Sequence, residues 1–234
     1  MLIMIDGIDG CGKSTIVSAW KKYLSDQGNA IFDLKNYLKE NDHYPKPHEF
    51  LNYDFIFSAE PTYTGVGKII REELISSSNS YPPKAVAEAF SLDRLVLYTK
   101  VIIPLLKDSR LVIQDRGISS SLAYQPLSHQ DITTDFVANL PGNQLALENR
   151  PDYLVLVDCS AQTSFDRLDS RIDKQDNAIF EKLEFLEKLT ARYSDKDYQK
   201  LFTDRGTQIL HLNGNEKIDI MKEQAVDLLK TILK

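Results

Sequence analysis

The sequence predicts an α/β protein with a doubly wound, P-loop NTPase-type sheet, in which about five parallel strands are flanked by helices. Two observations predict this fold. Short apolar runs alternate with longer amphipathic segments, which is the pattern of parallel strands joined by helices. The first apolar run also leads into a glycine-rich stretch and then an amphipathic segment, so that strand, loop and helix follow one another.

Each expected strand is a short apolar run, and the five runs are residues 1–6, 55–59, 110–115, 153–158 and 208–212. Apolar residues at helical spacing predict helices over residues 14–25, 85–106 and 180–202. The second of these is expected to end near Pro104, because proline interrupts a helix. Nothing forces a second domain, so a single domain is expected over residues 1–234.

Residues 33–53 do not fit this alternation of apolar strands and amphipathic helices. The segment is polar, contains Pro45 and Pro47, and carries several aromatic residues. We expect an insertion at the sheet edge, formed by a short helix and a loop that the aromatic residues pack onto the body. A partner-binding surface is the alternative.

Composition limits the possible functions. The 234 residues are 42% hydrophobic and 26% charged, which allows a sizeable buried core. The net charge of −6 argues against a broad nucleic-acid footprint and favours a small nucleotide held by local donors. The first apolar run is short and reaches Asp6, so we expect no membrane span, no signal peptide and a cytoplasmic location. Cys11 and Cys159 are expected to be reduced, buried thiols.

Residues 7–15 carry the strongest functional signal, because they match the phosphate-binding pattern G-x-x-x-x-G-K-[ST] without a gap: Gly7, Ile8, Asp9, Gly10, Cys11, Gly12, Lys13, Ser14 and Thr15. Glycines let backbone N–H groups converge on phosphate oxygens, and the following helix presents its positive end to the same anion. Lys13 can reach the β- and γ-phosphates of a triphosphate, and the Ser14 hydroxyl can ligate Mg²⁺. The alternative is a glycine-rich turn with an incidental lysine.

No N-K-x-D motif is present, which argues against a GTPase. Four segments after the phosphate loop make the functional prediction more specific. The phosphate loop is followed by Ala59-Glu60-Pro61, Phe90-x-x-x-Arg94, Asp115-Arg116 and Ser120-x-x-Ala123-Tyr124-Gln125. In order and spacing these segments resemble the thymidylate kinases over residues 1–193, interrupted by the insertion. The resemblance implies phosphoryl transfer from ATP to dTMP with Mg²⁺, and it allows a homodimer, since members of this family are often dimers.

The resemblance also implies roles for the acceptor side. Asp9 would lie near the 3′-hydroxyl of the acceptor, Phe90 would stack on its base, and Arg94 would reach O4 of thymine. Ser120, Ser121 and Gln125 would bond the pyrimidine, and Tyr124 would leave no room for a 2′-hydroxyl.

Phosphate and metal contacts are implied as well. Arg116 would clamp the acceptor phosphate, because a guanidinium matches phosphate oxygens. Glu60 and Arg71 belong to the stretch that resembles the family's R-E-P-G-G-T-x-x-G-x-x-I-R substrate segment. Asp115 follows an apolar strand and would either hold Mg²⁺ through water, together with Ser14, or orient the acceptor.

A lid is expected over residues 166–177, because phosphoryl transfer must exclude water. Its candidate cations are Arg167, Arg171 and Lys174. In this family the catalytic arginine comes from the phosphate loop or from the lid. Gly10 occupies the loop position here, so Arg171 of the lid is the predicted catalytic arginine.

Each position also has a structural alternative. Asp9 could cap a turn, Phe90 could be a core residue beside a solvated arginine, and Tyr124 could simply be buried. Asp115 and Arg116 could form a surface ion pair, and the lid cations could line a solvated helix.

Three departures from the family pattern leave the acceptor open. Ala59 stands where many relatives have arginine, so Arg71 could take over a phosphate contact; Gly117 replaces an aromatic residue, and Asn177 a common lid arginine. A kinase for dUMP or a modified pyrimidine nucleotide fits the same motifs. A deoxynucleoside kinase with Glu60 as its base, or a catalytically silent nucleotide-binding switch, are further alternatives.

Overall fold

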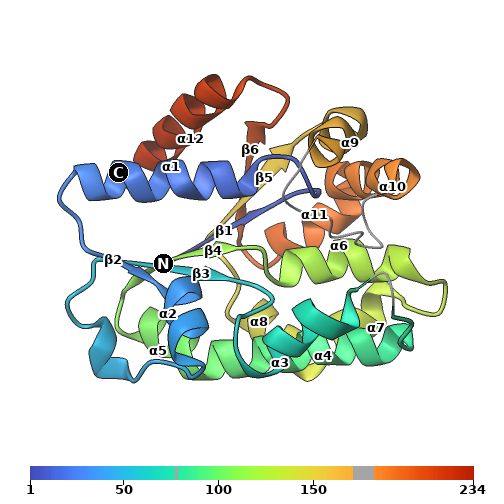
Figure 1. Cartoon of the computed structure of the whole chain (residues 1–234), viewed down its shortest axis with the longest axis horizontal. Coiled ribbons are helices and arrows are strands. Elements are labelled where there is room, and N and C mark those ends of the chain that lie inside the picture. The colour runs from blue at the N-terminus through green and yellow to red at the C-terminus, as the bar shows by residue number, and fades with distance from the viewer. Residues whose placement is uncertain (77–78, 171–181) are drawn as a thin grey trace.

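The computed structural model describes residues 1–76, 79–170 and 182–234. In this part of the chain, six parallel strands form one sheet in the order β2-β3-β4-β1-β5-β6 (Figure 1). The strands are β1 (Leu2–Asp6), β2 (Ile31–Asp33), β3 (Phe55–Ala59), β4 (Leu111–Asp115), β5 (Tyr153–Asp158) and β6 (Gln208–Asn213).

The predicted parallel sheet is confirmed, and the expected count of about five strands is one too low. The missing strand is β2, which pairs with β3 over three residues at the sheet edge. It escaped prediction because it is short and because Asp33 already caps the next helix, accepting a hydrogen bond from the Asn36 amide at 3.2 Å.

Helices cover both faces of the sheet, with α1 and α12 on one face and α4, α5 and α8 on the other (Figure 1). The described helices are α1 (Lys13–Asp26), α2 (Leu34–Asn41), α3 (Gly65–Ile69), α4 (Pro83–Leu97), α5 (Ile103–Lys107), α6 (Ile118–Ser128), α7 (Thr134–Ala138), α8 (Pro141–Glu148), α9 (Ala161–Asp169), α10 (Leu183–Ser194), α11 (Lys196–Thr203) and α12 (Ile218–Ile232). None of the helices described is long and apolar enough to cross a bilayer.

Two long helices predicted from the sequence differ in detail. The helix expected to end near Pro104 continues to Lys107, because a π-helical turn at Tyr98–Ile102 precedes the proline and lets α4 run on into α5. The helix predicted over residues 180–202 is divided at Asp195, whose carboxylate accepts a hydrogen bond from the Asp197 amide and begins α11.

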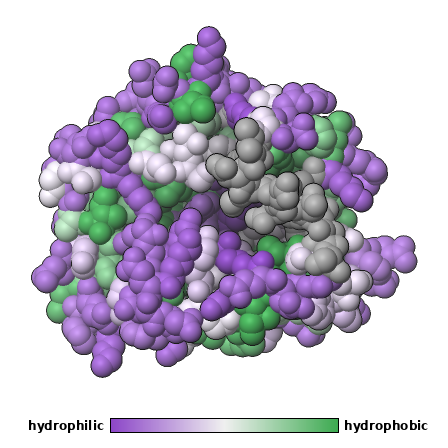
Figure 2. Space-filling view, in the orientation of Figure 1, coloured by the Kyte–Doolittle hydropathy of each residue, from purple (hydrophilic) through white to green (hydrophobic). Residues whose placement is uncertain are grey.

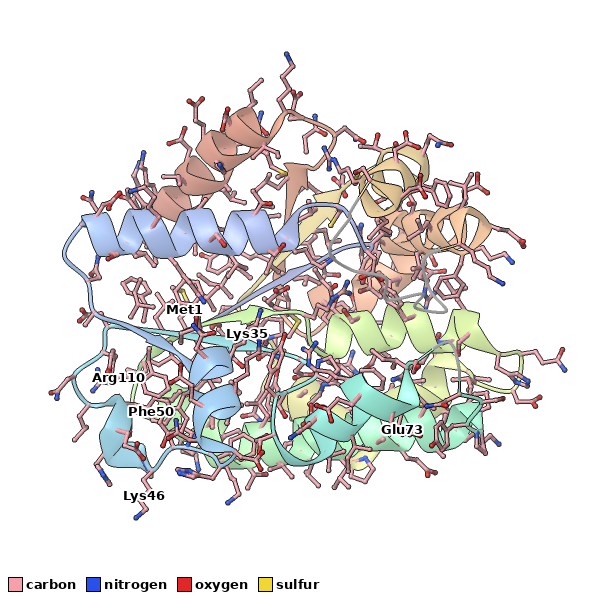
Figure 3. The ribbon with its side chains drawn as sticks, in the orientation of Figure 1. Met1, Lys35, Lys46, Phe50, Glu73 and Arg110 are labelled. Carbon is pink, nitrogen blue, oxygen red and sulfur yellow. The ribbon has the colours of Figure 1, made fainter. Side chains whose placement is uncertain are left out.

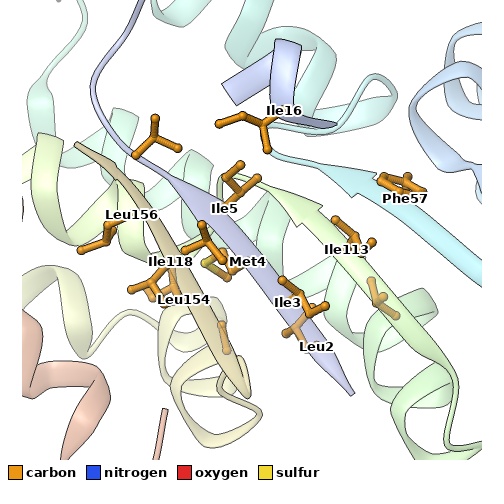
Figure 4. Close-up of a cluster of buried hydrophobic side chains, with 14 of the residues drawn as sticks. Leu2, Ile3, Met4, Ile5, Ile16, Phe57, Ile113, Ile118, Leu154 and Leu156 are labelled. Atoms are coloured by element: carbon orange, nitrogen blue, oxygen red, sulfur yellow. The ribbon is translucent and has the colours of Figure 1, made fainter. Parts of the chain in front are cut away.

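The central strand β1 is buried over its whole length, as expected for a parallel strand covered on both faces. Figure 4 shows its side chains, Leu2 to Ile5, between Ile113 of β4 and Leu154 and Leu156 of β5. This packing fixes the end of β1, and therefore the start of the glycine-rich loop, in the middle of the carboxyl edge of the sheet.

Residues 33–53 contain α2 and a 3₁₀ turn at Pro47–Phe50. Their aromatic residues gather around Phe32, whose ring centroid lies 5.4 Å from Tyr37, 4.8 Å from Phe50 and 5.0 Å from Tyr53. These rings hold the segment against the β2 edge, so they face inward and do not form an exposed aromatic surface.

Candidate functional site

The glycine-rich loop joins the end of β1 to the start of α1. Gly10 and Gly12 have φ angles of 79° and 105°, which favour glycine. A Cβ on Gly10 would lie 2.6 Å from the carbonyl oxygen of Ser164 on α9, and one on Gly12 would lie 2.7 Å from Met221 of α12. Both backbone angles therefore favour glycine, and at Gly10 a backbone oxygen also leaves no room for a side chain.

Lys13 is buried and closes the loop on itself. Its Nζ donates hydrogen bonds to the carbonyl oxygens of Gly7 at 2.8 Å and Ile8 at 2.7 Å. Ser14 is exposed in the first turn of α1, where helical amides lack an intrahelical partner. The first turn contains no acidic residue, so the loop presents positive potential.

The two cysteines are free thiols, as predicted. Cys11 is fully buried beneath the loop, and its Sγ lies 3.5 Å from the Lys13 Nζ. Burial raises the pKa of the Cys11 thiol, although the nearby lysine opposes the shift. The Cys11 side chain therefore packs beneath the loop as a small apolar group.

Asp9, Arg116 and Tyr124 form one cluster above the loop. The Arg116 Nη2 donates to the Asp9 carboxylate, and the Tyr124 hydroxyl donates to the other Asp9 oxygen at 3.0 Å. Arg116 Nη1 lies 3.1 Å from the Ser120 Oγ. Burial would lower the pKa of Arg116, but Asp9, Tyr124 and Asp6 together raise it, so the guanidinium stays charged. The side chain predicted to clamp the acceptor thus lies against the glycine-rich loop, and the alternative of a surface ion pair between Asp115 and Arg116 is wrong.

Asp6 organises this cluster from below and was missed by the sequence analysis. It is fully buried and accepts hydrogen bonds from the Gly7 amide and the Ser120 hydroxyl at 2.8 Å and from the Tyr193 hydroxyl at 3.0 Å. A signal was present, because Asp6 ends β1 as Asp115 ends β4.

Arg94 is only 1% exposed, so the alternative of a solvated arginine at this position is wrong. Its Nη2 lies 2.6 Å from a Glu60 carboxylate oxygen and 3.0 Å from the Ser121 Oγ, and its Nη1 donates to Asn143. The Gln125 amide nitrogen lies 3.3 Å from the same Ser121 Oγ. Four predicted residues (Glu60, Arg94, Ser121 and Gln125) therefore meet in one buried polar network.

This network contains unmatched polar atoms. The Nε of Arg94 and the Oε1 atoms of Gln114 and Gln125 are buried without a hydrogen-bond partner in the described part of the chain. Leaving such groups unpaired is costly, and they are typical of a site that receives a polar ligand.

Phe90 lies one helical turn before Arg94 on α4 but in a different setting. It is half-buried and does not belong to the packed hydrophobic core, so the alternative that it is a core residue is wrong. A ring face left partly open next to a buried polar network suits a planar ligand.

The Oδ1 of Asp115 is likewise buried without a hydrogen-bond partner among the described residues. Asp115 pairs in register with Ile5 of β1, which places its carboxylate at the same edge of the sheet as the phosphate loop. No group of three or more acidic, histidine or cysteine side chains in the described part could hold a metal ion.

The site lies at the carboxyl ends of the central strands, where Figure 2 shows a hollow bordered by hydrophilic side chains. A family model described as "Thymidylate kinase" matches residues 48–225. The chain belongs to the thymidylate kinase family. Relatives include the "Probable thymidylate kinase" of Methanocorpusculum labreanum, which is 30% identical over 84% of this chain and 83% of its own. The "Thymidylate kinase" of Mycoplasma genitalium is 27% identical over 100% of this chain and 95% of its own.

Membership in the thymidylate kinase family makes the chain a nucleotide-binding phosphotransferase that uses ATP. The fold agrees with this activity, because parallel α/β sheets bind ligands at the carboxyl ends of their strands. Most of the predicted residues that the structure describes follow β1, β3 and β4 or lie on α1, α4 and α6, whereas Arg71 lies on the turn Ile70–Leu74 and Arg167 on α9.

Relative to the thymidylate kinase pattern, Ala59 leaves one arginine missing. Arg71, the predicted substitute, donates from its Nε to the carbonyl oxygens of Pro61 at 3.0 Å and Thr62 at 3.1 Å. Its guanidinium carbon also stacks 3.8 Å from the centre of the Tyr63 ring. Burial lowers the pKa of Arg71. Arg71 therefore holds the loop after β3 in place.

The structure describes only part of the predicted lid at residues 166–177. Arg171 and Lys174 lie outside the described residues. Arg167 lies on α9, and its guanidinium donates to the carbonyl oxygens of Gly214 at 2.6 Å and Glu216 at 3.1 Å. Arg167 thus joins α9 to the β6–α12 loop.

Proposed function

We propose that this chain transfers the γ-phosphoryl group of ATP to dTMP, producing ADP and dTDP for dTTP synthesis. The contact between Arg116 and Asp9 carries the proposal. It brings a guanidinium from the end of β4 against the phosphate loop at the end of β1. A triphosphate on the loop and a monophosphate on Arg116 would therefore be neighbours, which a transfer between two nucleotides requires.

The donor would occupy the loop formed by residues 7–15. Backbone amides and the positive end of α1 suit its phosphate oxygens. Lys13 is already aimed along the loop by its hydrogen bonds to Gly7 and Ile8, and it would exchange these carbonyl oxygens for phosphate oxygens. The Lys13 ammonium makes a charge-assisted bond in either case, but an anionic phosphate oxygen adds an attraction between opposite charges that a neutral carbonyl oxygen lacks.

The acceptor base would lie between Phe90 and the Arg94 network. The exposed part of the Phe90 ring offers a stacking surface, and Ser121 and the unpaired Gln125 Oε1 offer polar partners for a pyrimidine edge. The Tyr124 hydroxyl, bonded to Asp9, would occupy the space that a 2′-hydroxyl needs, with Asp9 beside the 3′-hydroxyl. This arrangement favours a deoxyribonucleotide.

Ser14 and Asp115 fit a magnesium ion. The exposed Ser14 hydroxyl and the unpaired Asp115 Oδ1 are both hard oxygen donors. Mg²⁺ prefers such ligands and typically uses one or two protein oxygens together with substrate phosphates. When bound, it would neutralise charge on the donor phosphates.

The transfer needs no covalent enzyme intermediate, because it relies on positioning and on charge stabilisation. Arg171 of the proposed lid at residues 166–177 remains our choice for the cation that stabilises charge on the transferred group. We further propose one domain, a cytoplasmic location and a homodimer, on the strength of the family resemblance alone.

The rival reaction on a nucleoside is less well supported. Phosphorylation of a 5′-hydroxyl needs a free carboxylate base. Glu60, the candidate, is 4% exposed and held by Arg94 at 2.6 Å and by Gln114 at 2.8 Å. Burial raises the pKa of Glu60 to about 7, which suits a base, but each of its carboxylate oxygens is already engaged by one of these partners, so neither is free to accept a proton from a substrate.

The decisive test is ADP production from ATP and Mg²⁺ across a panel of pyrimidine nucleosides and their monophosphates. We expect the highest kcat/KM with dTMP, lower values with dUMP, and little turnover with thymidine. The Lys13→Ala variant should lose most turnover with its fold intact. Preference for thymidine over dTMP would contradict the proposal, as would ATP binding without any acceptor-dependent ADP release.

A further inference from the structure

Three cationic side chains converge on one aromatic ring beside the acceptor side of the site. Arg71 stacks on Tyr63, and the Nζ atoms of Lys39 and Lys35 lie 4.6 Å and 5.3 Å from the centre of the same ring. Tyr63 follows β3, whereas the two lysines come from α2 in the segment at residues 33–53. We call Lys35, Lys39, Arg71 and Tyr63 the cationic collar.

The collar carries charge that the described residues do not balance. Neither Lys35 nor Lys39 forms an ion pair within residues 1–76, 79–170 and 182–234. Asp33, two residues before Lys35, pairs with Lys21 at 2.6 Å, and Glu40, which follows Lys39, forms no ion pair with either lysine in the described part of the chain. Cation–π contacts stabilise each charge individually, but three like charges around one ring repel each other. An anionic ligand would remove that repulsion.

The segment that supplies the lysines is fastened to the loop after β3. The Thr64 hydroxyl donates to the Asp42 carboxylate at 2.9 Å, and Asp42 ends α2 in a left-handed conformation with φ 53°. The Tyr44 hydroxyl lies 3.4 Å from the Thr62 Oγ1. Two contacts from one segment therefore fix α2 over the 61–64 loop, and the lysine positions follow from the fold.

Topology places the collar at the edge where the proposed acceptor binds. α2 begins directly after β2, and β2 is parallel to β3 and β4, so the start of α2 lies at the carboxyl edge. Figure 3 shows Lys35 at this end of α2, whereas Lys46 of the same segment points outward at the far side. The charges of Arg116 and Asp115 both influence Arg71 electrostatically, which places the collar near the proposed phosphate clamp.

We propose that Lys35 and Lys39 hold the phosphomonoester group of the acceptor nucleotide and replace the arginine that Ala59 lacks. This inference rests on the proposed function. Arg71 directs its Nε and Nη2 donors at the carbonyl oxygens of Pro61 and Thr62, which leaves it fewer donors for a phosphate group. The lysines are positioning residues, because they orient the acceptor phosphate and take no part in bond making.

The test compares dTMP with thymidine, which lacks only the phosphate, and includes ATP as the ligand of the donor side. Binding of dTMP, thymidine and ATP is measured by calorimetry for the unmodified chain and for a Lys35→Gln/Lys39→Gln double variant. Because the variant removes a half-exposed charge at Lys35 and an exposed charge at Lys39 from the surroundings of a dianionic ligand, we expect the Kd for dTMP to rise about tenfold. Binding of thymidine and ATP should stay unchanged, and steady-state assays should show a higher KM for dTMP with kcat nearly constant.

Two matched variants guard against a purely structural effect. Lys46→Gln removes a charge from the same segment away from the collar and should leave all three affinities unchanged. Lys35→Arg/Lys39→Arg keeps both charges and should restore most of the dTMP affinity. Equal weakening of thymidine and dTMP, or unchanged dTMP binding in the glutamine variant, would overturn the proposal while leaving the kinase activity standing. An unmodified chain that does not phosphorylate dTMP would remove both.

Discussion

At the scale of single residues, the proposed acceptor site combines a buried charge with a half-buried aromatic side chain. Arg94 is enclosed by Glu60, Ser121 and Asn143, whereas Phe90, one turn away on the same helix, is half-buried and outside the core. The motif F-x-x-x-R fixes only that both side chains share one helix face. Their different surroundings come from α6 and α8, which cover Arg94 and leave Phe90 partly open.

Replacement of Phe90 tests the stacking surface. Phe90→Ala should reduce the kcat/KM for dTMP by roughly tenfold to a hundredfold, since stacking on an aromatic side chain is worth about 1–3 kcal/mol per base. The thermal midpoint should change little, because the ring lies outside the core. Steady-state kinetics with dTMP and dUMP check the prediction. Unchanged pyrimidine preference and unchanged KM would show that Phe90 does not contact the base.

At the scale of elements, the site depends on close approaches between backbones. Gly142 on α8 lies so near α4 that a Cβ there would overlap the Ser91 carbonyl oxygen, and its amide donates to the Ser91 Oγ at 2.9 Å. This contact presses α8 onto the helix that carries Phe90 and Arg94. The neighbouring Asn143, also on α8, can therefore reach Arg94.

Gly142→Ala should separate α4 from α8. Because the obstacle is backbone, we expect a loss of about 3 kcal/mol in the free energy of unfolding. The dTMP affinity should fall more than the ATP affinity, since α4 carries acceptor residues only. Urea unfolding and calorimetry measure both effects. The control is Glu148→Ala on the same helix, where an exposed substitution should cost less than about 0.5 kcal/mol. Equal stability of the two variants would contradict the packing argument.

At the scale of the whole molecule, a buried carboxyl group links stability to pH. Burial raises the pKa of Glu60 to about 7, although Arg94 opposes the shift. An unfolded chain would have an ordinary glutamate pKa near about 4.3. The folded state therefore binds the proton more tightly, and this group contributes stability below about pH 4.3 that is lost as the pH rises through 7.

Glu60→Gln should remove this pH dependence. The free energy of unfolding of the unmodified chain should fall between pH 5 and pH 7.5 by on the order of 3 kcal/mol more than that of the variant. Urea unfolding at both pH values gives the comparison. Parallel losses in the two proteins would show that Glu60 keeps an ordinary pKa in the folded state.

The parallel sheet and five of its six strands were predicted from apolar runs, because strands buried on both faces leave a continuous hydrophobic signal. β2 was not predicted, since three residues at a sheet edge give too short a pattern. The strand, glycine-rich loop and helix at residues 2–26 were predicted because that motif depends on local spacing, and phosphate binding by the loop stays a prediction. Asp6, Asn143 and Tyr193 were missed, because each acts through contacts with residues far away in the sequence.

The sequence by itself determined the fold class, the phosphate loop and the family resemblance, because each is encoded in short-range order along the chain. Only the tertiary structure decided that Arg116 pairs with Asp9 and not with Asp115, and that Arg94 is buried with Glu60. It alone placed Lys35 and Lys39 around Tyr63. The physical reason is that burial and charge pairing depend on which strand ends become neighbours in the sheet, and that order differs from the order of the chain.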